Sequence, residues 1–126
     1  MTPKHGVVLI IVFGVLTSFA VPAQAADPSP GSAYFKLCAT QYNMGKAADA
    51  IAACDRAIEA DPTLADAYFV KGSALYGNGT LDRNNKYILP PGTLEALKKY
   101  LELAPDGVHA ADVHAMLDAL DDPAKQ

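Results

Sequence analysis

The sequence predicts an all-α domain of two antiparallel helix hairpins followed by a C-terminal capping helix, with an insertion inside the second hairpin. The first supporting observation is an internal repeat, because residues 34–45 (YFKLCATQYNMG) return in similar form 34 residues later as residues 68–79 (YFVKGSALYGNG). The second is the recurrence of small and apolar residues every three or four positions, as on one face of a helix. Self-similarity at a fixed period indicates a repeat architecture.

The N-terminal segment has the three parts of a secretory signal peptide. Lys4 and His5 precede an apolar run over residues 7–20, and Ala23-Gln24-Ala25 forms a small-x-small cleavage site. The run is shorter than the roughly 20 residues of a membrane-spanning helix, although an uncleaved anchor is the alternative. We therefore expect cleavage after Ala25, and a periplasmic or secreted protein with no membrane association once residues 1–25 are removed.

The first helix pair follows a short linker. Residues 26–32 are rich in Pro, Gly and Ser, and Ser32 is a suitable N-cap for a helix over about residues 33–44. Gly45 ends this helix. A second helix, over about residues 46–60, has an apolar face at helical spacing and stops at Asp61-Pro62, because proline disfavours helical geometry in the residue before it.

The second pair carries an insertion. A third helix over about residues 64–76 repeats the first, but Pro62 and Pro105 are 43 residues apart, so nine residues are added within residues 77–92. Apolar residues flank Asn84-Asn85 in this insertion, which predicts a small β-hairpin or an ordered loop.

The C-terminal part is expected to hold two more helices. Thr93 caps a fourth helix over residues 94–103, whose expected buried face consists of Leu94, Leu97, Tyr100 and Leu101. A fifth, more polar helix over about residues 108–120 suits a terminal cap. Residues 121–126 form a tail.

The repeat is similar to the tetratricopeptide repeat (TPR), a helix–turn–helix unit of about 34 residues. The matching positions are an aromatic, a small residue four positions on, a second aromatic and a glycine: Tyr34, Cys38, Tyr42 and Gly45, then Tyr68, Gly72, Tyr76 and Gly79. The resemblance covers about residues 33–120 and implies a scaffold that binds another protein. Two repeats and a cap are fewer than the three or more that usually give a stable core, so a further stabilising feature is expected.

The two cysteines of the chain are candidates for that feature. Cys38 and Cys54 fall at similar heights on two antiparallel helices, and an oxidising compartment would favour a disulfide between them. Closing a loop of this size contributes about 3 kcal/mol in the chain-entropy model. The alternative is a pair of buried thiols that pack as small apolar groups.

Composition and motifs argue against catalysis and against nucleic-acid binding. Without residues 1–25 the net charge is −5, because Lys4 is the one charged residue removed from a chain of net charge −4. Such a chain lacks the basic patch that binds phosphate backbones or anionic lipid. His109 and His114 are five residues apart and do not share a helix face, and we expect both to be solvated or capping residues. We therefore predict no enzymatic activity, no metal and no cofactor.

The resemblance to TPR proteins implies a partner-binding groove lined by the first helix of each repeat. The matching positions are mostly aromatic and carry no charge: Phe35, Ala39, Tyr42, Phe69, Ser73 and Tyr76. Such a groove suits an apolar extended segment or an amphipathic helix, although the tyrosines among these residues could instead be core. Tyr34 and Tyr68 are assigned to the core. Tyr87 of the insertion either reaches the partner or folds back over the groove.

The expected function is a non-catalytic interaction scaffold of the bacterial cell envelope, whose partner is another protein or a peptide segment. The alternative is a structural subunit that completes its core by forming a homodimer or by docking on a larger assembly. The two differ in whether the isolated mature chain is a stable monomer.

Overall fold

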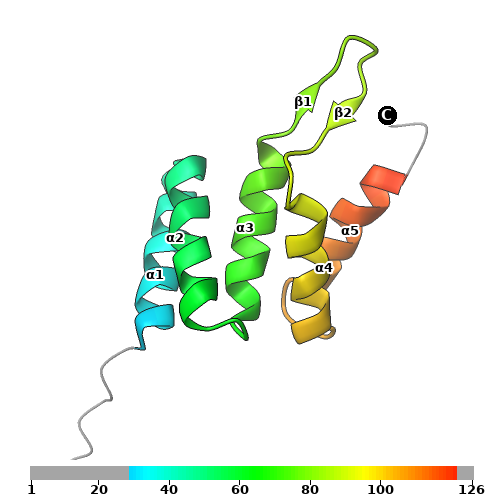
Figure 1. The fold of residues 1–126 in the computed structure, drawn as a ribbon. Coiled ribbons are helices and arrows are strands. Elements are labelled where there is room, and N and C mark those ends of the chain that lie inside the picture. Colours follow the sequence, from blue (N-terminus) through cyan, green and yellow to red (C-terminus); the bar gives the residue numbers. More distant parts are fainter. Residues whose placement is uncertain (1–28, 122–126) are drawn as a thin grey trace, which may run out of the picture.

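The computed structural model describes residues 29–121, which form five helices and one two-stranded antiparallel sheet (Figure 1). The order is α1 (Pro30–Asn43), α2 (Ala47–Ala60), α3 (Ala65–Gly77), β1 (Thr80–Leu81), β2 (Tyr87–Ile88), α4 (Thr93–Leu103) and α5 (Ala110–Asp121). The prediction of a helical protein is confirmed, and the insertion is a β-hairpin. The expected signal peptide, most of the expected linker and residues 122–126 lie outside the described range.

The helices lie side by side in chain order, and each packs mainly on its neighbour in sequence (Figure 1). The main contacts join α1 to α2, α2 to α3 and α3 to α4, with a smaller contact between α4 and α5. The hairpin leaves the end of α3, extends beyond the helices and returns to the start of α4. Within residues 29–121, no helix combines the length and the hydropathy that a membrane span requires.

The first helix begins earlier than the sequence suggested. Ser29 is the N-cap, and its Oγ accepts a hydrogen bond from the Ser32 amide at 3.2 Å. Pro30 follows as the first helical residue, where its missing N–H is not needed. The prediction that Ser32 caps the helix is therefore wrong, and residues 30–32 of the expected linker belong to α1. Gly45, with φ of 73°, adopts the left-handed conformation that ends a helix.

The connection between α2 and α3 is a local turn held by Asp61. Its carboxylate accepts hydrogen bonds from the Thr63 hydroxyl at 2.6 Å and from the Thr63 amide at 3.0 Å. These two bonds, the hydroxyl first, hold the pKa of Asp61 below its ordinary value. Pro62 follows in the turn, as predicted.

The core has two clusters of buried side chains. One surrounds the cysteines and contains Cys38, Ala53, Cys54 and Val70; the other contains Leu97, Tyr100, Ala110 and Val113. Phe69 of α3 packs against both clusters. Gly72 permits the close approach of α3 and α4, because a Cβ at this position would lie 2.7 Å from Leu97 Cδ2.

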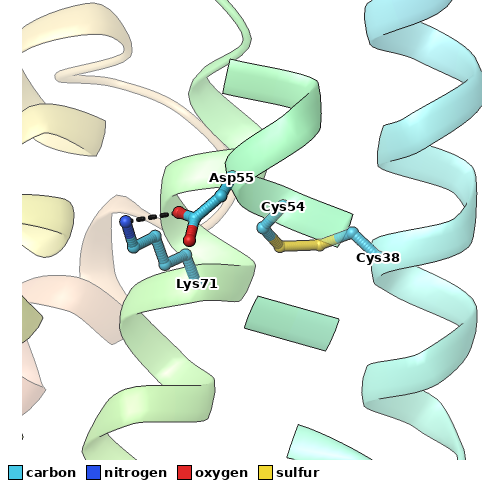
Figure 2. Close-up of polar contacts among 4 residues, drawn as sticks. All are labelled: Cys38, Cys54, Asp55 and Lys71. Carbon is cyan, nitrogen blue, oxygen red and sulfur yellow. Dashed lines mark ion pairs between the residues drawn. A yellow bond between two sulfur atoms is a disulfide. The ribbon is translucent and has the colours of Figure 1, made fainter. Parts of the chain in front are cut away.

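A disulfide joins α1 to α2 inside the first cluster, which confirms the predicted pairing (Figure 2). Cys38 and Cys54 are both fully buried, and their Cα atoms are 5.0 Å apart. The next residue, Asp55, forms an ion pair with Lys71 of α3 at 2.5 Å. The middle of α2 is thus linked covalently to α1 and by an ion pair to α3.

The hairpin has a three-residue loop with a defined turn. The Asn85 amide donates to the Asp82 carbonyl at 3.1 Å, and the Asp82 amide donates to the Lys86 carbonyl at 2.9 Å. Asn85 has φ of 65°, which fits a type I turn followed by a left-handed residue. The Asp82 carboxylate also accepts from the Asn84 and Lys86 amides, each at 2.8 Å. These local bonds fix the register of β1 and β2.

The start of α4 differs in detail from the prediction. Gly92, in the left-handed conformation, occupies the N-cap position, so the assignment of Thr93 as the cap is wrong. Thr93 is the first helical residue and its hydroxyl donates to the Pro90 carbonyl at 2.7 Å. This bond ties α4 to the end of the hairpin.

Candidate functional site

The candidate site is a groove of about 650 Å³ enclosed by the hairpin, the exposed side of α4 and the C-terminal turns of α5. Its apolar walls combine side chains from α3, the hairpin, α4 and α5: Tyr76, Leu81, Tyr87, Ile88, Leu89, Leu94, Leu117 and Leu120. Its charged residues are Lys86, Lys98 and Asp121. Elements far apart in sequence therefore converge on one hollow at the C-terminal end of the molecule.

Tyr87 anchors the hairpin to the last turn of α3. Its hydroxyl donates a hydrogen bond to the Tyr76 carbonyl, and the two rings are tilted with centroids 5.9 Å apart. Gly79 makes room for this contact, because a Cβ there would overlap the Tyr87 ring. The hydrogen bond satisfies the polar end of a side chain whose ring is half-buried. Tyr87 thereby fixes one wall of the groove.

Large apolar side chains remain exposed around the groove. Leu94 is 39% exposed, Ile88 45% and Leu81 61%. The prediction that Leu94 lies on the buried face of α4 is therefore wrong: the buried face runs through Ala96, Leu97 and Tyr100, and Leu94 is turned toward the hairpin side. Several exposed apolar groups that share one concavity are typical of a binding surface.

The groove is locally basic in an acidic chain. Lys86 comes from the hairpin, Lys98 from α4 and Asp121 from the end of α5. Among the ion pairs found within residues 29–121, none involves either lysine. The ammonium groups are therefore available to an anionic group of a ligand.

The structure brings together two of the residues that the sequence placed on the binding surface. Tyr76 and Tyr87 both line the groove, and the hairpin that carries Tyr87 extends beyond the helices (Figure 1). Phe35 and Ala39 are half-buried on α1, and Phe35 packs against the disulfide cluster. Tyr42, also on α1, is 38% exposed.

Phe69 and Ser73 are covered to different degrees by neighbouring side chains. The Phe69 ring is stacked on His109, with centroids 3.9 Å apart and an interplanar angle of 2°. Ser73 is 9% exposed, and its Oγ has no hydrogen-bond partner within the described part of the chain. Neither residue lines the groove at the hairpin.

His109 has a structural environment that the sequence did not reveal. Its ring covers Phe69, and its amide donates to the Tyr100 hydroxyl at 2.9 Å. The segment between α4 and α5 is thereby fastened over the second core cluster. His109 directly precedes α5 and its side chain is 36% exposed, in keeping with the expected solvated or capping position. The stack on Phe69 is not predicted, because it depends on how the segment before α5 packs on α3 and α4.

Tyr34 and Tyr68, which the sequence assigns to the core, differ in exposure. Tyr34 was placed in the core, but it is 36% exposed and Arg56 lies 5.9 Å from its ring centroid. Tyr68 is half-buried and packs against the second cluster, as expected.

Within residues 29–121, no group of three or more His, Cys, Asp or Glu side chains is arranged to hold a metal ion.

Comparison of the sequence with models of known protein families finds no match. Comparison with curated proteins likewise finds none.

Proposed function

We propose that this protein is a non-catalytic interaction module that binds an extended segment of another protein in the groove between the hairpin, α4 and α5. The observation that carries the proposal is the convergence of exposed Leu81, Ile88 and Leu94 on one cavity of about 650 Å³. A cavity of this size suits a few side chains of a peptide. Burying such apolar surface on binding contributes about 25 cal/mol per Å² before the cost of ordering the peptide.

The helix pairing supports a TPR-like scaffold as the framework of this module. α1 packs on α2 and α3 on α4, the two members of each proposed repeat, and α2 packs on α3 between the repeats. In this proposal α5 is the capping helix, and the hairpin adds a wall that a plain repeat lacks. The groove then lies at the C-terminal end of the array and includes Tyr76, one of the residues that the TPR resemblance places on the partner-binding surface.

We propose the cell envelope as the compartment in which this module works. The disulfide between Cys38 and Cys54 is of the kind that persists in oxidising compartments and is rare in the cytosol. It agrees with the signal peptide that the sequence predicts for residues 1–25. The partner would be another envelope or secreted protein.

Selection from a phage-displayed library of random dodecapeptides, with the purified protein as bait, tests the proposal. Selected peptides should bind with a Kd that rises at least about fivefold in Leu94→Ala, since a central apolar contact typically contributes over 1 kcal/mol. Leu37→Ala is the matched control, because Leu37 is 44% exposed on α1 and lies outside this groove. Equal affinities for the two variants, or an empty selection, would contradict the proposal.

Sedimentation velocity over a range of protein concentrations tests the structural-subunit alternative. The interaction module is expected to remain a monomer without peptide. A dimer that dissociates in Leu94→Ala but not in Leu37→Ala would show that the groove is an interface between copies of this chain.

A further inference from the structure

We infer that the bound segment adds to the hairpin as a third β-strand along the outer edge of β2 and directs a carboxylate at Lys86 and Lys98. The inference rests on the proposed function, because it assumes that the groove is the binding site. It specifies how the partner is held and which chemistry the partner must carry.

The register of the hairpin shows which backbone groups face outward. In an antiparallel pair, opposed residues alternate between those that exchange hydrogen bonds with each other and those that do not. Asp82 and Lys86 form the bonded pair next to the loop, and Leu81 opposite Tyr87 comes next. Tyr87 is therefore in a non-bonded pair, and its amide and carbonyl point away from β1.

The outward edge continues past the end of β2. Leu89 is two residues beyond Tyr87, and it precedes Pro90, which favours an extended conformation in the residue before it. Pro90 lacks an N–H, but it falls at an inward-facing position of the alternation. The outer edge therefore presents donor and acceptor groups at Tyr87 and Leu89, about 6.6 Å apart along the strand.

This edge borders the groove. The stretch of residues 86–89 lines the cavity, and β2 lies on the α5 side of β1 (Figure 1). A strand paired with β2 would lie between the hairpin and the last turns of α5. Alternate side chains of that strand would project toward the apolar wall that includes Leu94 and Leu117. Backbone bonds would supply affinity and the wall would select side chains, as in other cases of strand addition.

The charge of the groove favours one of three possible occupants: a second copy of the chain, the residues after Asp121, or a segment of another protein. A second copy paired through its own β2 would bring another Lys86 toward a groove whose lining already holds Lys86 and Lys98 against one acidic residue, Asp121. The five residues after Asp121 (DPAKQ) contain no large apolar side chain to fill the cavity. An apolar extended segment with an acidic side chain complements both the apolar wall and the two ammonium groups.

An N-methyl scan of a dodecapeptide selected from the library tests the strand geometry. Methylating an amide removes one hydrogen-bond donor, so strand addition predicts at least tenfold weaker binding for methyl groups at alternate positions and smaller losses at the positions between them. Amide hydrogen exchange of the protein is the companion measurement: Tyr87 and Leu89 should exchange fast in the free protein and slowly in the complex.

A charge swap tests the second half of the inference. Lys98→Glu should raise the Kd of the selected peptide at least tenfold, whereas Lys36→Glu, at an exposed position of α1, is expected to change this Kd less than twofold. Replacing the acidic residue of the peptide with lysine should restore binding to Lys98→Glu. If the lysine-substituted peptide bound Lys98→Glu no better than the original peptide does, the electrostatic assignment would be overturned.

The outcomes separate this inference from the proposed function. A peptide that requires Leu94 but shows no alternation in the N-methyl scan would overturn strand addition and leave the groove as the binding site. An unchanged hydrogen-exchange rate at the Tyr87 amide in the complex, as expected for a peptide that binds as a helix, would also overturn strand addition and leave the groove as the binding site. An empty selection would overturn both.

Discussion

Reduction of the disulfide between Cys38 and Cys54 should remove about 3 kcal/mol from the free energy of unfolding. The bond closes a loop with a sequence separation of 16 and lies fully buried between α1 and α2. In the chain-entropy model such a loop lowers the entropy of the unfolded chain by about 10 cal/mol/K, which is about 3 kcal/mol at 298 K. Typical domains have a net stability of only about 5–15 kcal/mol, so this is a large fraction.

Urea unfolding followed by circular dichroism, with and without the reductant TCEP, measures the effect. With a slope of about 1–1.5 kcal/mol/M for a small domain, the midpoint should fall by roughly 2–3 M on reduction. The variant Cys38→Ala/Cys54→Ala is the control, because TCEP should not change its midpoint. A shift below about 0.5 M, or thiols that react in the unreduced native protein, would refute the reasoning.

Three further predictions concern packing and pH. Leu97→Ala should lower the free energy of unfolding by about 2–5 kcal/mol in urea titrations, because Leu97 is fully buried; a loss below about 1 kcal/mol would contradict the packing of α3 on α4. Gly79→Ala should displace Tyr87 from α3 and abolish the NOEs between the Tyr87 and Tyr76 rings. Gly77→Ala should retain these NOEs, because a Cβ at Gly77 would meet no other atom within 4 Å. Because the folded-state pKa of Asp61 is lowered, its contribution to stability is present above the unfolded-state pKa and is lost as the pH falls through the lower folded-state value. Thr63→Ala should raise the pKa of Asp61 in an NMR titration, and an unchanged pKa would count against the turn.

The helical framework could be predicted from sequence because its signals are local. Gly45 and Asp61-Pro62 mark helix ends by backbone chemistry that acts within a few residues. The cysteine pairing followed from helix geometry, since Cys38 and Cys54 fall at similar heights on adjacent helices. The start of α1 could not be predicted as well, because Ser29 and Ser32 are both acceptable caps, and Pro30 as the first helical residue favours Ser29.

The groove could not be predicted because it depends on contacts between distant segments. Helical periodicity groups Leu94 with Leu97 on one apolar face, but it does not show that the hairpin stops short of covering Leu94. Nor does it place Leu117 of α5 opposite the hairpin. Phe69 was expected to face a partner, and its burial under His109 depends on the path of the segment between α4 and α5. Tertiary packing decided each of these positions.

The most direct test of the central claim is NMR mapping of where a selected dodecapeptide binds. Titration of the ¹⁵N-labelled protein should shift the amides of residues 86–89, 94–98 and 117–121, which surround the groove, and leave those of Tyr42 and its neighbours on α1 unchanged. Shifts confined to α1 and the middle of α3, with none in the hairpin, would contradict the account.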